Sequence, residues 1–242
     1  SGDISLFTME VFLFLSVCCL WSRIMLAVAV IQATADFVTD YPLILVVPIL
    51  NIIFCLGYLV YWLYTGVYIF SSGEVVWKPG RAYGRVAWGF ATRLHWYVHL
   101  FALFWDFSFI MYLSHFVICV VVVTWYFAPD KGDLGYPITK GYLWGPTYHI
   151  GSIAFGSLIL AFVWALQATL NYMQQQVETL SSNGPTKYLV SCLKCVVSCL
   201  ERLIKYLSEH AFIEIAIKSS NFVKASSDAI SLILSNVVRM GV

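Results

Sequence analysis

The chain has 242 residues, of which 60% are hydrophobic, 17% are aromatic and only 11% are charged. Charged residues make up about a quarter of ordinary soluble domains, so this composition excludes a soluble globular protein and indicates a membrane protein. The formal net charge of +1 gives no support to nucleic-acid binding through overall basicity.

Four long apolar runs are predicted to span the membrane as helices, because each is long enough to cross the hydrocarbon core. They cover about residues 11–31, 41–70, 95–127 and 148–173. The intervening segments 71–93 and 128–147 are interrupted by glycine and proline and are predicted to be loops. The runs are continuously apolar rather than alternating, which argues against a strand barrel.

The last part of the chain has a different pattern. Over about 187–207, leucines and valines recur at helical spacing with basic residues between them, which predicts an amphipathic helix at the membrane interface. A further segment, 211–240, is also expected to be helical. The expected fold is therefore all-α: a polytopic transmembrane helix bundle with an amphipathic interfacial helix, in which residues 1–242 form part of one membrane domain. Because the chain begins Ser-Gly without a Met, we expect a longer parent protein.

The second predicted helix has two distinct faces at about 100° per residue. Its aliphatic side chains lie on one face, and the other carries Asn51, Phe54, Tyr58, Tyr61, Trp62 and Thr65. Polar groups in hydrocarbon need partners, so the second face is expected to point into the bundle or a cavity. Ordinary packing and an interfacial aromatic belt explain the same pattern equally well.

The third predicted helix carries its ionisable side chains in one narrow sector. His95, His99 and Asp106 fall together there, beside an aromatic stripe of Trp105, Phe109, Tyr112 and Phe116. An acid inside a span is costly unless it is paired, hydrated or protonated, so Asp106 is a functional hypothesis, with a hydrogen-bonded structural acid as the alternative. If it is ionised beside aromatic rings, it attracts an organic cation, whose ammonium the ring faces also stabilise.

Other features indicate packing rather than catalysis. Small residues recur at intervals of four in the fourth predicted helix, at Ser157, Ala161, Ala165 and Thr169, and favour close helix contact. Cys192, Cys195 and Cys199 lack a fourth ligand at finger-like spacing, so no metal is expected; acylation at the membrane surface and plain packing both remain open. No nucleotide-binding, hydrolase or metalloprotease motif is present in the sequence, and we expect neither an enzyme nor a cofactor.

Several stretches of the sequence are distinctive enough to indicate a protein family. The run Arg23–Ile31, the string H-x-G-S-x-A-F-G-S-L-I-L-A over 149–161, and the segments 192–205 and 211–217 resemble the choline transporter-like proteins, in order and over nearly the whole chain. The resemblance implies a polytopic plasma- or organelle-membrane protein that moves choline, and in some members ethanolamine, with further helices before and after this stretch. Family members tend to have a Tyr-Gly pair where this chain has Lys218 and Ser219, so the family's local turn is not carried over to these two positions.

Together these observations favour a carrier for choline or ethanolamine. The candidate substrate-binding residues are Tyr58, Tyr61, Trp62, Trp105, Asp106, Phe109 and Tyr112. Their rings would surround the ammonium, Asp106 would supply the counter-charge, and His99 is a proton-coupling candidate. The expected partners are membrane lipids and the remaining helices of the full-length chain. The alternative is a non-transporting membrane scaffold, in which the rings are helix contacts. A proton path through His95, His99 and Asp106 is less favoured, since no polar chain continues across the span.

Overall fold

The structure is a computed structural model that describes residues 2–77, 84–180 and 185–239. Within these ranges the regular elements are helices apart from one short two-stranded hairpin, and the expected all-α class is confirmed. In chain order they are α1 (Gly2–Asp40), the 3-10 helix η1 (Pro42–Leu45), α2 (Val46–Ser71), β1 (Glu74–Val76), β2 (Arg85–Ala87), α3 (Phe90–Phe127), α4 (Pro137–Tyr148), α5 (Ile150–Leu180), α6 (Pro185–Lys218) and α7 (Phe222–Arg239).

Among the described residues, three helical segments are long and apolar enough to cross a membrane. They are Pro42–Ser71, Phe90–Phe127 and Ile150–Glu178. They match the predicted spans at 41–70, 95–127 and 148–173, because continuous hydrophobicity over this length identifies such helices reliably. The predicted span at 11–31 lies within α1, where several side chains, including that of Arg23, fall outside the described part of the structure.

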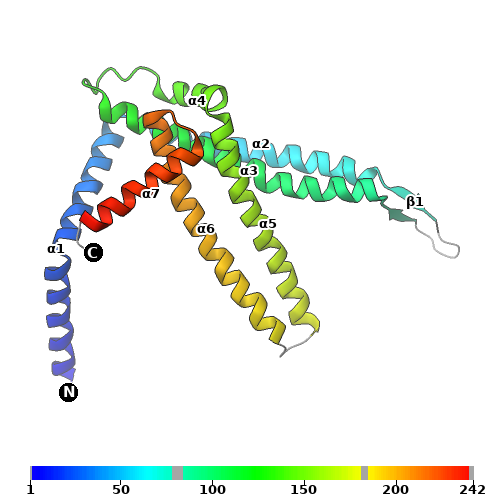
Figure 1. Cartoon of the computed structure of the whole chain (residues 1–242), viewed down its shortest axis with the longest axis horizontal. Helices are drawn as coiled ribbons and strands as arrows, with labels where there is room; N and C mark the ends of the chain where they lie inside the picture. The colour runs from blue at the N-terminus through cyan, green and yellow to red at the C-terminus, as the bar shows by residue number, and fades with distance from the viewer. Residues whose placement is uncertain (1, 78–83, 181–184, 240–242) are drawn as a thin grey trace.

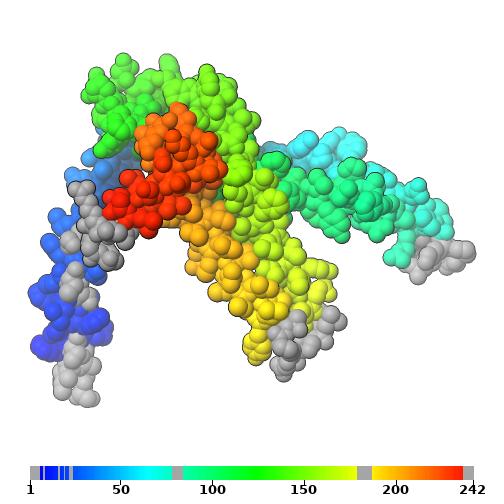
Figure 2. All heavy atoms as spheres, in the orientation of Figure 1, coloured from blue at the N-terminus to red at the C-terminus, as the bar shows by residue number. Residues whose placement is uncertain are grey.

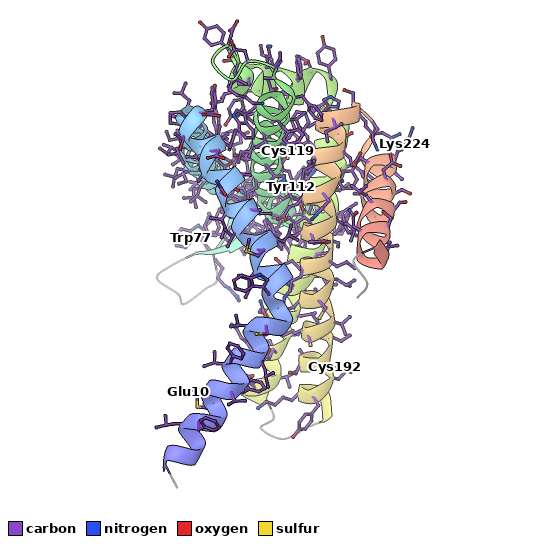
Figure 3. The ribbon with its side chains drawn as sticks, turned by 90° about the vertical axis from the view of Figure 1, so that its left-hand side faces the viewer. Glu10, Trp77, Tyr112, Cys119, Cys192 and Lys224 are labelled. Carbon is purple, nitrogen blue, oxygen red and sulfur yellow. The ribbon has the colours of Figure 1, made fainter. Side chains whose placement is uncertain are left out.

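Helix α3 is the centre of the molecule, since it packs against α2, α4, α5 and α6. Figure 1 shows the α2–α3 pair extending to one side of this centre and the α5–α6 pair to another, with α1 as a separate arm. The lower half of α1 also stands apart from α5 and α6 in the space-filling view of Figure 2. The main core joins α3, α5, α6 and α7 through Tyr112, Phe116, Ile153, Phe212 and Phe222. In Figure 3, Tyr112 and Cys119 lie among the packed helices, whereas Lys224 lies on the outer side of α7.

The prediction of a loop over 128–147 is wrong, because α4 occupies its second half. Pro137 stands in the first turn, where proline is tolerated. Two glycines that read as helix breakers instead allow α4 to approach α3. A Cβ on Gly141 would lie 3.1 Å from the Cα of Val117, and one on Gly145 would lie 2.6 Å from Leu113 Cδ1. Tertiary contact with α3 therefore outweighs the low helix propensity of glycine.

Two further boundaries differ from the sequence-based expectation. The predicted loop at 71–93 contains the antiparallel β1–β2 hairpin, with Val75 opposite Val86, and the first turn of α3. The expected break between 207 and 211 is absent from the described structure, because α6 continues to Lys218. Its last turns bury Ala211, Phe212 and Ile215 in the core, and this packing extends the helix beyond its amphipathic part.

Candidate functional site

Asp106 lies on the side of α3 that faces α2. The Tyr58 hydroxyl, on α2, donates a hydrogen bond to Asp106 Oδ2 at 2.8 Å and also lies 3.2 Å from the Ala102 carbonyl oxygen. Both Tyr58 and Asp106 are half-buried. The tyrosine partly satisfies a carboxyl group that would be costly alone in an apolar span.

His99 lies two helical turns before Asp106 and forms a stack of aromatic rings. The Trp62 ring is parallel to the His99 imidazole, with 4.6 Å between centroids and 3° between planes, and the Trp96 ring stacks at 5.6 Å. Trp62 Nε1 also donates to the His99 carbonyl oxygen at 2.9 Å. The His99 Nε2 atom is buried without a hydrogen-bond partner in the described part of the chain. Protonation of this imidazole would create a cation against tryptophan faces.

Gly66 explains how α2 accommodates this stack. A Cβ at this position would lie 3.2 Å from His99 Nε2 and 3.7 Å from Trp96 Cζ3. Contacts of 3.2 Å are tighter than side chains normally accept, so the imidazole occupies space that only glycine leaves free. The sequence analysis missed both Trp96 and Gly66. Trp96 lies one helical turn before His99, and this spacing could have identified it. Nothing in the sequence around Gly66 indicated its contact with the histidine.

The other predicted substrate residues are not gathered around Asp106. Trp105 Nε1 lies 3.3 Å from the Ala154 carbonyl oxygen of α5, and the Tyr112 ring lies 5.1 Å from that of Phe212 on α6. Phe109 packs against the main core. Residues 105 and 112 lie roughly 100° or more around the helix from 106, which carries them from the α2 side to the α5–α6 side.

On α2, the Tyr61 side chain is 62% exposed. Its ring centroid lies 6.5 Å from that of Tyr58. The expectation that all seven residues enclose one guest is therefore corrected: Tyr58, Tyr61, Trp62 and Asp106 share the α2–α3 face, and the other three do not.

The small-residue stripe of α5 is used inside the chain. Ser157 and Ala161 are fully buried, and the Ser108 hydroxyl of α3 donates to the Ser157 carbonyl oxygen at 2.9 Å. Ala165 is half-buried and Thr169 is exposed. The prediction of close helix contact is confirmed for the buried half of the stripe. A scaffold that docks a partner on this stripe would have to displace α3.

A second polar cluster joins α5 to α6. Glu201 accepts hydrogen bonds from Trp164 Nε1 at 2.9 Å, Gln167 Nε2 at 2.6 Å and Lys205 Nζ at 2.6 Å. Burial alone would raise the pKa of the Glu201 carboxyl, but these donors outweigh it and lower the pKa to about 2. The cluster holds an ionised acid between two helices and has a structural role.

The six described cysteines, which include Cys192, Cys195 and Cys199, are free thiols. No group of three or more potential metal-ligating side chains is found among the described residues. For the three cysteines of α6, acylation and plain packing both stay predictions.

Long apolar helices around a central span, with an acid held inside it, define a polytopic helical membrane protein. Residues 4–242 match the family described as plasma-membrane choline transporter, and the chain belongs to this family. It is 31% identical over 223 residues to choline transporter-like protein 2 of Dictyostelium discoideum, covering 91% of this chain and 35% of that protein.

Mammalian proteins show the same relation. Choline transporter-like protein 2 of Bos taurus is 28% identical over 269 residues, covering 96% of this chain and 38% of that protein. Choline transporter-like protein 5 of Mus musculus is 26% identical over 276 residues, covering 99% and 39%. The chain thus spans well under half of the length of these relatives.

Proposed function

We propose that the full-length protein carries choline or a related small organic cation, such as ethanolamine, across the membrane. The observation that carries the proposal is Asp106, a carboxyl group inside the apolar span α3 that meets Tyr58 across the interface with α2, where Trp62 also packs against α3. The names of the related proteins support transport rather than an enzymatic reaction.

In this proposal the ammonium of the substrate lies against Asp106. A carboxylate in a medium of low dielectric attracts a cation strongly, and each aromatic face adds about 0.5–2 kcal/mol. Tyr58 fixes the carboxyl group, and the rings of Tyr61 and Trp62 lie on the same side of α2. We assign substrate contact to these four residues and no longer to the three that face α5, α6 and the core.

The face is open at Tyr61, and helices outside this chain would complete the enclosure. His99 stays the proton-coupling candidate: it lies on the Asp106 side of α3, and its buried Nε2 has no partner among the described residues. The scaffold alternative is less favoured, because Ser157 and Ala161 of the small-residue stripe it depends on are already buried inside the chain.

Uptake of radiolabelled choline by the full-length protein tests the proposal. Asp106→Asn should lower uptake at least about tenfold, which corresponds to a loss of about 1.4 kcal/mol, and Tyr58→Phe should lower it less. Asp133→Asn, in an exposed loop, is the matched control and should have no effect. Unchanged uptake by well-expressed Asp106→Asn would refute the assignment.

The two tryptophans give a second comparison. Trp62→Ala removes a ring from the α2–α3 face, whereas Trp105→Ala removes a ring that contacts α5. The proposal expects the half-saturating choline concentration to rise in the first variant and to change little in the second.

A further inference from the structure

A separate cavity lies between α2, α3 and α6. Its volume is about 250 Å³, and its walls include Asn51 of α2, Met111, Tyr112 and His115 of α3, and Glu209 of α6. Asp106 does not line it. Position 51 precedes position 58 by seven residues on α2, which at 1.5 Å per residue places the cavity about 10 Å along the helix pair from the Tyr58–Asp106 contact.

Three polar atoms of residues in the cavity wall are unsatisfied. Asn51 Oδ1, the Tyr112 hydroxyl oxygen and His115 Nε2 are buried and have no hydrogen-bond partner in the part of the chain that the structure describes. Most buried polar atoms in proteins are hydrogen-bonded, so a group of unsatisfied ones beside a cavity points to a ligand that supplies missing bonds. Tyr112 is 6% exposed.

The charge around the cavity selects the kind of guest. Glu209 is an exposed carboxyl group in its wall, and neither lysine nor arginine is among the described residues that line it. A small cation would therefore be attracted, and an anion would be repelled. Met111 and the Tyr112 ring provide polarisable surface of the kind that accommodates methylated ammonium groups.

We propose that this cavity is a second binding site for a small ammonium alcohol, with Glu209 facing the ammonium and Asn51 and His115 bonding the hydroxyl group. A hydroxyl group can donate its one proton to the Asn51 oxygen and accept a hydrogen bond from His115 Nε2–H, so it satisfies both atoms in the histidine tautomer that is protonated at Nε2. The inference rests on the proposed function for its ligand class. It adds that a substrate with a hydroxyl group has a second binding site about two helical turns from Asp106.

Two probes separate the contributions of the cavity. Choline carries both the ammonium and the hydroxyl group, whereas tetramethylammonium carries only the cation. Equilibrium binding of each probe to the purified full-length protein is measured for the wild type, Asn51→Ala, Glu209→Gln and the control Glu178→Gln, whose carboxyl group is exposed on α5.

We expect Glu209→Gln to raise the Kd of both probes about fivefold to tenfold. Asn51→Ala should raise the Kd of choline by a similar factor and leave that of tetramethylammonium unchanged, and the control should change neither. Wild-type affinity for choline in both Asn51→Ala and Glu209→Gln would overturn the inference.

The outcome for the cavity is distinguishable from the outcome for transport. Loss of uptake in Asp106→Asn with wild-type choline binding in both cavity variants would reject the second site and leave the proposed function intact. Absence of choline uptake by the wild type, with choline binding that still depends on Asn51 and Glu209, would reject transport and support the site.

Discussion

Glu201 gives the most quantitative prediction, because three donors from two helices converge on its carboxylate. A fall in pKa from 4.5 to about 2 corresponds to roughly 3 kcal/mol in favour of the ionised form. Lys205 is 40% exposed, so solvent screens part of this energy. Glu201→Gln also replaces one acceptor oxygen by an amide NH2 group, a donor that then faces the donors Trp164 and Lys205 or the donor Gln167. We expect the free energy of unfolding to fall by about 1–2 kcal/mol.

The apparent melting temperature of the full-length protein in detergent measures this loss. We expect a decrease of roughly 2–8 °C, and the control Glu178→Gln, which removes an exposed carboxylate on the same helix pair, should shift the temperature little. A double-mutant cycle with Gln167→Ala isolates the coupling between the two side chains. Additive effects with no coupling, or an unchanged melting temperature in Glu201→Gln, would refute the reasoning.

The same cluster predicts a pH dependence with a definite sign. Because the pKa of Glu201 is lower in the folded state than in the unfolded chain, its stabilisation is fully present above about pH 4.5. It is lost as the pH falls from there toward 2, where the folded protein takes up the proton. The difference in melting temperature between wild type and Glu201→Gln should therefore shrink over this interval and stay constant from pH 6 to 8.

Three other substitutions test how the helices fit together, each by its change in melting temperature. Gly66→Ala places a Cβ 3.2 Å from a histidine nitrogen and should cost about 1–3 kcal/mol, whereas Gly57→Ala on the same helix meets nothing within 4 Å and should be neutral. Gly156→Ala, whose Cβ would lie 2.8 Å from a phenylalanine ring of α7, should destabilise more than Gly151→Ala. Ser219→Gly should stabilise by about 1 kcal/mol, because φ is 53° at this residue; a decrease in stability would contradict the assigned strain.

The spanning helices were predictable because their signal is local. Each of α2, α3 and α5 carries a continuous apolar run, and hydrophobicity over one span needs no knowledge of neighbours. Helix α4 was missed for the opposite reason. Its glycines have low helix propensity, and only the approach of Val117 and Leu113 from α3 shows why they are there.

The candidate site was predictable in part. Helical periodicity placed His99 and Asp106 on one face, and in the structure both meet α2, through Trp62 and Tyr58. The same periodicity placed the aromatic stripe beside them, but it gave no information on which helix covers that adjacent sector. In the structure α5 and α6 cover it, so Tyr112 meets Phe212 rather than a guest at Asp106.

The second cavity shows the limit more sharply. Glu209 follows His115 by more than ninety positions in the chain, and no local pattern connects them. They meet only because the last turns of α6 pack against α3, the part of α6 that the sequence-based boundary at 207 had separated from the amphipathic helix. Because the predicted amphipathic helix ended at 207, the proximity of Glu209 to His115 could not be predicted.

The distribution of charge over α6 supports a cation as the guest of that cavity. Lys205 is paired with Glu201, and Lys218 is paired with Glu214 at 2.7 Å and with Asp228 at 3.3 Å. Glu209 lies between these pairs along the helix and has no ion-pair partner among the described residues. Because the two lysines that flank it along the helix, Lys205 and Lys218, are paired with their own acids, the Glu209 carboxylate keeps its attraction for a cation that arrives from outside.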